Sequence, residues 1–261
     1  MRDPWAVYDA LIEGVDPTRT VDYFAPGALW SQVWSGPDTG VAMGLRGQGP
    51  RRMYPTPHDG MSLKDMARMV KSWNMFEASL GAAALNCYYN TIDRVDRMDG
   101  FGGFDVKRGQ IPPRRFRELN AFIAFQEEIE GKNVVVIGHF PHLEQRFADR
   151  CNMTILERNP RKGDLPDPAC EYIMRDQDYA FITGTTIINK TLPRLLELAG
   201  DHCKVSMVGP STCMAPILFD YGVDNLSGYC VQDRDIVDQA VRLGSMSILF
   251  DGGYMASADR S

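Results

Sequence analysis

The feature that most constrains this chain is a regular alternation of short apolar runs and helical segments from residue 132 onward. The first run, Val134–Ile137, contains no polar residue. A continuous apolar, β-branched strand is typical of a parallel sheet that is covered by helices on both faces. Six strands are expected, at 134–137, 154–156, 179–182, 204–208, 226–231 and 246–250. Helices are expected between them, near 141–149, 168–175, 186–199, 215–221 and 234–243. This pattern predicts an α/β fold with a Rossmann-like, doubly wound parallel sheet.

The first hundred residues combine helical spacing with a β-hairpin. Two β-like runs, 28–34 and 40–45, flank Ser35-Gly36-Pro37-Asp38, where Gly and Pro indicate a turn. The segment 46–60 is a loop long enough to suggest a functional role. Apolar residues at helical spacing predict helices over 5–15, 63–73 and 75–97.

These patterns divide the chain into three parts. We predict a smaller N-terminal α+β domain over residues 1–100 and a Rossmann-like ligand-binding domain over residues 131–261. Residues 101–130 are expected to form a linker, rich in Gly, Pro and charge, and a bridging helix over 115–130.

Charge and composition exclude several classes of partner. The 261-residue chain has a net charge of -6, which argues against nucleic acid or an anionic membrane as its main partner. Its sequence contains neither a run of about 20 apolar residues nor the pattern of a signal peptide. The six cysteines contain no Cys-x-x-Cys pair, so reduced thiols are expected. We therefore expect a cytoplasmic protein that binds a small molecule, and association into a homo-oligomer stays open.

Ligands of an open parallel sheet bind at the carboxyl ends of its strands, so the strand-to-helix turns are the candidate sites. The first turn has Gly138 but lacks the further glycines of a dinucleotide motif, which disfavours ordinary NAD binding. His139 and His142 are candidates for binding a ligand or a metal or for transferring a proton. The alternative is that both are ordinary polar residues of a turn. Glu157 follows the second strand, where an acidic residue binds ribose in nucleotide-binding folds; Glu157 and Arg158 could equally lie on a solvated loop.

Two later turns are rich in hydroxyl groups. Thr183-Gly184-Thr185-Thr186, with Asn189 one turn further on, combines close backbone approach with hydroxyls and helix N–H groups that suit a phosphate or carboxylate. Gly209-Pro210-Ser211-Thr212 repeats this design. The alternative for both turns is a helix capped by hydroxyl groups. Asn86, with Asn90 four residues later, lies in an apolar helical stretch and must find hydrogen-bond partners there or in a ligand.

These motifs resemble a known family. Asp178–Thr191 and Val208–Thr212, together with Ser79–Asn86 upstream, are similar to segments of the heavy-metal chelation domain family. The resemblance implies an enolase-N-terminal-like domain followed by a Rossmann-like domain, with a site between them. The loop 46–60, which contains His58, has no identified counterpart in that pattern. The site positions implied by the resemblance are Asn86, Gly138, Glu157, Arg158, Thr183, Gly184, Thr185, Thr186, Asn189, Gly209, Pro210, Ser211 and Thr212.

Three functions stay open at this point. The first is a metal-linked protein that binds a small anionic ligand or a metal chelate in an interdomain cleft, with a divalent heavy metal or its chelate as the candidate cofactor. The second is an enzyme acting on a small metabolite with a nucleotide-like cofactor such as S-adenosylmethionine. The third is a sensor or carrier that binds without turnover.

Overall fold

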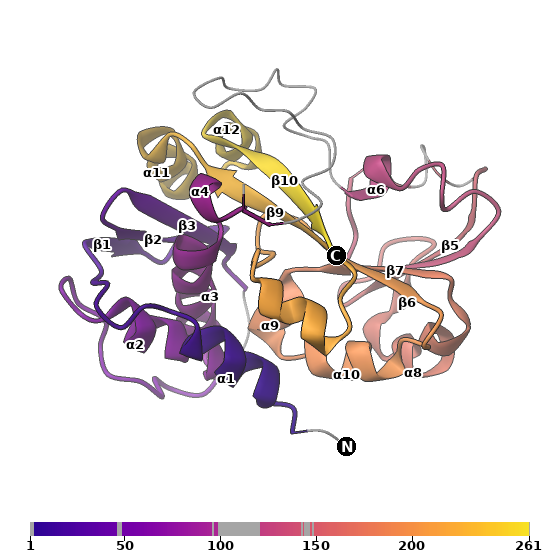
Figure 1. The fold of residues 1–261 in the computed structure, drawn as a ribbon, viewed down its shortest axis with the longest axis horizontal. Helices are drawn as coiled ribbons and strands as arrows, with labels where there is room; N and C mark the ends of the chain where they lie inside the picture. Colours follow the sequence, from indigo (N-terminus) through magenta and orange to yellow (C-terminus); the bar gives the residue numbers. More distant parts are fainter. Residues whose placement is uncertain are drawn as a thin grey trace.

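The chain folds around two sheets in a computed structural model, which describes residues 3–45, 49–95, 97–98, 121–141, 143, 147 and 149–260. A three-stranded antiparallel sheet and its helices form one side of the molecule, and a seven-stranded sheet forms the other (Figure 1). The small sheet has the order β1-β2-β3, with β1 at Tyr23–Ala25, β2 at Trp30–Ser35 and β3 at Asp38–Met43. The helices of this half are α1 (Ala6–Glu13), α2 (Leu63–Arg68), the 3-10 turn η1 (Met69–Lys71), α3 (Met75–Tyr89) and α4 (Ile92–Val95).

The large sheet has the order β10-β9-β8-β7-β4-β5-β6. Its strands are β4 (Asn133–Ile137), β5 (Asn152–Glu157), β6 (Leu165–Pro166), β7 (Tyr179–Thr183), β8 (Lys204–Val208), β9 (Asn225–Val231) and β10 (Gly253–Asp259). The strands from β4 to β9 are parallel to one another. Counted along the chain, they lie in the order 3-2-1-4-5-6, which is the order of a doubly wound sheet. The predicted α/β class is confirmed, and the order reverses between β4 and β7.

One predicted strand is wrong. Residues 246–250 belong to helix α12 (Met246–Asp251), and the last strand is β10, which pairs antiparallel with β9. The hydroxyl of Ser245 accepts a hydrogen bond from the Ile248 amide and so begins a helix. A short, mostly apolar segment such as Met-Ser-Ile-Leu-Phe fits a strand or a helix equally well, so periodicity alone could not separate them.

Two predicted helices are each interrupted. The helix expected over 75–97 ends at Tyr89 and resumes as α4, because the side chain of Asn90 bonds to another part of the fold. The helix expected over 186–199 divides into α9 (Thr185–Asn189) and α10 (Leu192–Leu198). Lys190 lies between them with a φ of +66°, a conformation that does not continue a right-handed helix.

The other connections of the large sheet are short. They comprise α6 (Ala121–Ala124), the 3-10 turns η2 (Asp167–Ala169), η3 (Met174–Asp176) and η4 (Pro216–Tyr221), and the helices α8 (Cys170–Ile173) and α11 (Arg234–Leu243). The bridging helix expected over 115–130 is described only from residue 121, where α6 is followed by turns. The linker expected before it lies outside the described residues, as does part of the helix expected over 141–149. None of the described helices is long and apolar enough to cross a membrane.

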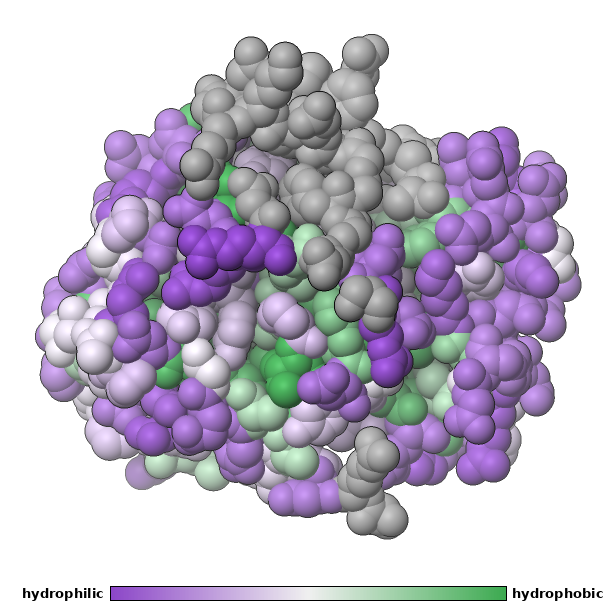
Figure 2. Space-filling model, viewed as in Figure 1, coloured by the Kyte–Doolittle hydropathy of each residue, from purple (hydrophilic) through white to green (hydrophobic). Residues whose placement is uncertain are grey.

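The two faces of the large sheet are buried against different parts of the chain. On one face, Val135, Ile182 and Met207 belong to a core that also contains residues of α1, α2 and α3. On the opposite face, Val136 and Phe181 pack with aromatic and aliphatic residues of the segment that begins with α6. The first half of the chain therefore covers one face of the large sheet. On the face drawn in Figure 2, hydrophilic residues lie to the left and right and hydrophobic residues gather between them.

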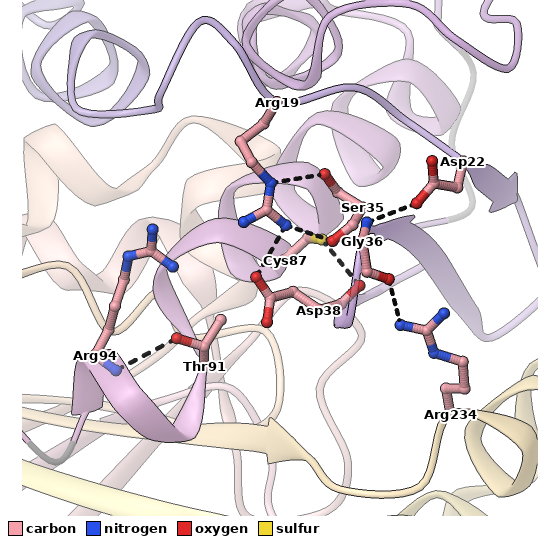
Figure 3. A network of polar contacts seen from close by, with 9 residues as sticks. All are labelled: Arg19, Asp22, Ser35, Gly36, Asp38, Cys87, Thr91, Arg94 and Arg234. Atoms are coloured by element: carbon pink, nitrogen blue, oxygen red, sulfur yellow. Dashed lines mark hydrogen bonds and ion pairs between the residues drawn. The ribbon is translucent and has the colours of Figure 1, made fainter.

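The predicted hairpin is confirmed, with its strands shifted by about two residues. Gly36, with a φ of +58°, and Pro37 form the turn between β2 and β3. The Arg19 guanidinium donates to Ser35 and forms an ion pair of 2.9 Å with Asp38 (Figure 3). Arg234, at the start of α11, donates to the Gly36 carbonyl oxygen, so the hairpin also holds a C-terminal helix beside it (Figure 3).

The loop that follows the hairpin is anchored by a buried carboxylate. Residues 46–48 lie outside the described residues. Further on, the amides of Met53 and Tyr54 donate to Glu77, which is 4% exposed, and the Ser72 hydroxyl donates to the same carboxylate at 2.5 Å. The described part of the loop is therefore bonded to the start of α3.

Candidate functional site

Three strand-to-helix turns meet where the strand order reverses. A Cβ on Gly138, after β4, would lie 3.0 Å from Cγ2 of Thr183 at the end of β7. The ring of Phe140 lies beside both Gly138 and Gly209, at 3.7 and 3.4 Å from the Cβ atoms that these glycines lack. Both glycines have a φ near +100°, which is costly for other residues. The Phe140 ring therefore lies against the turns after both β4 and β8.

Glu157 is bonded to the first turn. One of its carboxylate oxygens accepts from the His139 amide at 2.9 Å and the other from the Asn159 amide at 3.0 Å. Both oxygens therefore already have a partner within the protein, unlike an acidic residue that awaits a ribose. Arg158 is exposed and forms an ion pair of 3.1 Å with Asp167, so it lies on a solvated loop.

A second carboxylate holds the ring of His139. Nδ1 of His139 lies 3.0 and 3.1 Å from the two oxygens of Asp164, and the two side chains are only 9% and 1% exposed. The Arg161 amide donates to the same carboxylate at 2.8 Å and fixes its orientation. Sequence reasoning missed Asp164, because it lies 25 residues from His139 in a loop without periodicity. The preceding Gly163, with a φ of +102°, was the only local signal of a tight turn.

The Thr-Gly-Thr-Thr turn divides into an open and a buried part. Thr183 and Thr185 are half-buried, and their hydroxyl oxygens lie 3.2 Å apart. Thr186 is buried and donates its hydroxyl to the Thr183 carbonyl oxygen at 2.7 Å. Asn189 accepts from the amide and hydroxyl of Thr191 and thereby orders the start of α10. Two hydroxyl groups of this turn are therefore placed to meet a ligand.

The Gly-Pro-Ser-Thr turn faces the N-terminal half of the chain. Ser211 is 4% exposed, and its hydroxyl oxygen accepts from the Met43 amide of β3 at 2.8 Å. A Cβ on Gly184 would lie 2.3 Å from the Thr212 amide nitrogen, so the two hydroxyl-rich turns touch through their backbones. Pro210, between Gly209 and Ser211, is half-buried.

Asn86 of α3 and Asn90, which follows the last residue of this helix, complete the contact. Nδ2 of Asn86 donates to the Val41 carbonyl oxygen at 2.8 Å. Asn90 donates to the carbonyl oxygens of Thr212 and Tyr229 and accepts from the Met214 amide. The residues Asn86, Asn90, Ser211 and Thr212 are called the seam below.

The seam contains two buried atoms without a partner in the described part of the chain. They are Oδ1 of Asn86 and Oγ1 of Thr212. An unsatisfied buried polar atom costs stability unless an ordered water or a ligand bonds to it. The seam joins the halves of the chain, and the cleft expected between them remains a prediction.

A second group of residues lies around the carboxyl ends of β4, β5 and β7 and is called the switch-point site below. It consists of Gly138, His139, Glu157, Asp164, Thr183 and Thr185. It combines a histidine ring held by a carboxylate with two half-buried threonines on the neighbouring turn. Hydroxyl groups of this kind can donate hydrogen bonds to an anion.

A bare metal ion does not fit the described donor set. Within the described ranges, no three His, Cys, Asp or Glu side chains are grouped so that they could hold a metal ion. His142 lies outside the described residues, so the expected pairing of His139 with His142 stays a prediction. Burial raises the pKa of the Cys87 and Cys203 thiols to about 12, which keeps both protonated at neutral pH.

A surface cavity of 380 Å³ lies at the opposite end of the large sheet, near the start of β8 and the end of β10. Its lining consists of ionisable residues: Asp201, His202, Cys203, Lys204, Asp224, Asp259 and Arg260. It shares no residue with the switch-point site, so His202 offers a control histidine for experiments on His139.

Two family models match the chain, and both carry the description "Putative heavy-metal chelation". One matches residues 120–258, which is more than half of the chain, and the other matches residues 8–89. The chain belongs to this heavy-metal chelation family. The matches cover both the seven-stranded sheet and the N-terminal half, as the resemblance of the turn motifs implied.

Relatives of known structure share the whole fold. A protein of unknown function from Desulfitobacterium hafniense is 35% identical, with a TM-score of 0.82 and complete coverage of both chains. A protein of unknown function from Pyrococcus horikoshii has a TM-score of 0.75 at 19% identity over 97% of this chain and 98% of its own, a likeness of fold alone. An uncharacterized protein of Methanocaldococcus jannaschii is 27% identical over 225 residues, which are 82% of this chain and 78% of that protein.

Proposed function

We propose that this chain binds a small anionic ligand at the switch-point site and that a metal chelate is the best candidate for this ligand. The observation that carries the proposal is the placement of two half-buried threonines, Thr183 and Thr185, whose hydroxyl oxygens lie 3.2 Å apart on the turn that touches Gly138. His139, next to Gly138, adds an imidazole whose orientation is set by Asp164. Hydroxyl donors and one oriented imidazole suit a ligand that carries both carboxylate groups and a metal.

The donor set favours a chelate over a bare ion. Borderline divalent metals bind three or four nitrogen, sulfur or oxygen ligands in proteins. The described residues offer no such group, and both oxygens of Glu157 already accept from backbone amides. A metal that arrives with its own organic ligands needs only recognition of those ligands and at most one further donor. The heavy-metal description of the family is compatible with such a ligand.

Isothermal titration would test this proposal. Nickel(II) citrate, citrate alone and free nickel(II) would each be titrated into the purified chain. We expect the chelate to bind more tightly than the free ion. Thr185→Val should weaken chelate binding about tenfold through the loss of one hydrogen bond to a charged group. His202→Ala, at the other end of the sheet, should leave it unchanged. Tight binding of free nickel together with no binding of the chelate would contradict the proposal.

A second candidate is an enzyme that uses a nucleotide-like cofactor such as S-adenosylmethionine. The observation that favours it is the 3-2-1-4-5-6 strand order, with Glu157 at the end of the second parallel strand. The bonds of Glu157 and the position of Phe140 weaken this candidate. Stabilisation by S-adenosylmethionine or a nucleotide in a thermal-shift assay, lost in Glu157→Gln, would support it over a chelate-binding protein.

A sensor or carrier would use the same switch-point site without turnover. This reading predicts that the chelate or other anion leaves the protein chemically unchanged. Mass spectrometry of the ligand after prolonged incubation separates it from an enzyme, because only an enzyme gives a new product.

A further inference from the structure

Three large apolar side chains are exposed around the start of α3. Met53 is 50% exposed, Trp73 48% and Phe76 54%. The Trp73 amide donates to the sulfur of Met53 at 3.2 Å, and Phe76 follows in the first turn of the helix. Single exposed apolar residues are ordinary, but a group of them at one place marks an interaction site. These three residues are called the apolar patch below.

The backbone beneath the apolar patch is bonded to the rest of the fold. The Met53 amide donates to the buried carboxylate of Glu77, and Nδ2 of Asn74 donates to the Pro50 carbonyl oxygen at 3.0 Å. The side-chain oxygen of Asn74 also accepts from the Phe76 amide and so begins α3. A partner that covers the patch therefore does not have to order this segment first, which favours its affinity.

The two flanks of the apolar patch carry opposite charges. On one flank, Arg51 and Arg52 are exposed and form no ion pair within the described residues, and the sequence has no acidic residue from position 39 to 58. On the other flank, the Trp73 ring packs edge-on against Trp5, with 5.8 Å between the ring centroids. The Trp5 amide donates at 3.0 Å to Asp3, an exposed carboxylate that also has no ion pair in the described part of the chain.

A two-fold contact between two copies of the chain would match these charges. In such a contact the same surface of both copies meets, so the basic flank of one copy lies over the acidic flank of the other. Lys71 and Asp9, also beside Trp5, form an ion pair of 2.7 Å and neutralise each other. Aromatic residues, methionine and arginine are enriched at protein–protein interfaces. The surface therefore combines an apolar centre of suitable composition with flanks that are complementary to themselves.

We propose that the apolar patch and its two charged flanks form the interface of a homodimer, with Trp73 at its centre and Arg51 of each subunit facing Asp3 of the partner subunit. A second copy fits better than an unrelated acidic protein, because the same surface supplies both signs of charge. No residue of this surface belongs to the switch-point site or to the seam, so the inference does not depend on the proposed ligand.

Sedimentation velocity over a range of micromolar concentrations would measure the association. We expect the wild-type chain to form a dimer. Trp73→Ala should raise the dissociation constant of this dimer by about 30-fold or more, the effect of truncating an aromatic residue at the centre of an interface. Tyr172→Ala is the matched control, because it removes an aromatic side chain that is 87% exposed on α8, and it should leave the dissociation constant unchanged.

Charge reversals test the two-fold pairing and do not remove apolar surface. Arg51→Asp and Asp3→Arg each place like charges opposite each other in a homodimer, so each variant alone should be monomeric where the wild type is a dimer. An equimolar mixture of the two variants restores both contacts between opposite charges and should form a heterodimer. Lys132→Asp reverses an exposed lysine next to β4 and should leave the wild-type dimer intact.

A wild-type chain that stays monomeric would overturn this inference, and binding of that monomer to phosphatidylglycerol vesicles would assign the apolar patch to an anionic membrane. A dimer whose dissociation constant is unchanged in Trp73→Ala, or in both charge-reversed variants, would place the interface elsewhere and overturn the inference as well. Monomers in the mixture of the two variants would overturn the two-fold pairing. Weakening by each variant and recovery in the mixture would support it.

Discussion

The hydroxyl groups of the switch-point site and those of the seam lie on similar turns and differ in burial. Thr183 and Thr185 keep part of their surface exposed, and their hydroxyls bond to each other. Ser211 and Asn86 are buried, and each bonds to a backbone group of β3. Hydroxyl groups on the two turns therefore have different partners. That of Ser211 joins two halves of the chain, and those of Thr183 and Thr185, on half-buried residues, bond to each other and are the ones for which we propose a ligand.

The largest effect that tests this contrast is expected in the seam, from Asn90→Ala. Asn90 bonds to the carbonyl oxygens of Thr212 and Tyr229 and to the Met214 amide. Its removal takes one hydrogen bond from each of three buried backbone groups, so the free energy of unfolding should fall by about 3–5 kcal/mol. Urea denaturation followed by circular dichroism measures the change. Asn159→Ala, on the exposed loop after β5, serves as the control and should change stability by no more than about 0.5 kcal/mol. A loss below about 1 kcal/mol in Asn90→Ala would show that the seam is not tightly packed.

The contact between the two hydroxyl-rich turns can be broken by Gly184→Ala. The added methyl group would lie 2.3 Å from the Thr212 amide nitrogen, a backbone atom that cannot rotate away. The turns must then separate, and the expected loss of stability is about 2–3 kcal/mol. A lower melting temperature in calorimetry, with weaker chelate binding, would follow from displacement of Thr185. An unchanged melting temperature would mean that the turns do not pack as described.

A third contact between the halves of the chain depends on pH. The Lys190 ammonium donates to the Ser72 and Ile188 carbonyl oxygens, and burial lowers its pKa to about 8 from its ordinary value of 10.5. Between these values the unfolded chain still binds a proton that the native protein has lost, so this group makes stability rise with pH through that window.

Lys190→Met removes this dependence. As pH rises from about 8 to about 10, the free energy of unfolding of the wild type should rise relative to that of the variant by about 1 kcal/mol. This figure is smaller than the pKa shift alone would give, because Lys190 is half-buried and solvent screens its charge. Urea denaturation of both proteins across this range measures the difference, and effects of the buried thiols cancel in the comparison. If the difference in stability between the two proteins stays constant with pH, the Lys190 amine is not buried as described.

Removal of the unpaired Thr212 hydroxyl should change the stability of the protein less, and the direction of the change is informative. Thr212→Val replaces a buried group that has no partner in the described part of the chain with a methyl group of similar size. The variant should be neutral or more stable by up to about 1 kcal/mol. A clear loss of stability in thermal unfolding would reveal that an ordered water or a ligand bonds to this hydroxyl, and the seam would then belong with the binding site.

The smallest effect on stability is expected at the open site. Thr185 is half-buried at the strand end, so Thr185→Val should change the free energy of unfolding by less than about 0.5 kcal/mol. The same variant is expected to weaken chelate binding in isothermal titration. Thr186→Val is the matched buried control, because it removes the hydroxyl bond to the Thr183 carbonyl oxygen and should cost about 1 kcal/mol. Equal losses of stability in both variants would remove the distinction between open and buried hydroxyls.

Local patterns predicted most of the strands of the large sheet but not its last element. Val134–Ile137 is an unbroken β-branched run, Lys204–Val208 mixes polar and apolar residues, and both lie in strands. Met246–Phe250 is also mostly apolar and lies in a helix, because Ser245 caps it and β10 follows. The breaks at Asn90 and Lys190 were also not predictable, since the side chains that end these helices bond to residues far away in sequence.

The amino-acid sequence alone determined the alternation of strands and helices, the hairpin at Gly36 and the turns that carry Gly138, Thr183 and Gly209. These features depend on local periodicity and on backbone preferences of single residues, which neighbours along the chain decide. Only the tertiary structure decided that Asp164 meets His139 and that Ser211 meets Met43. Such contacts join segments separated by up to 168 residues, and burial of one group by another depends on how whole layers pack.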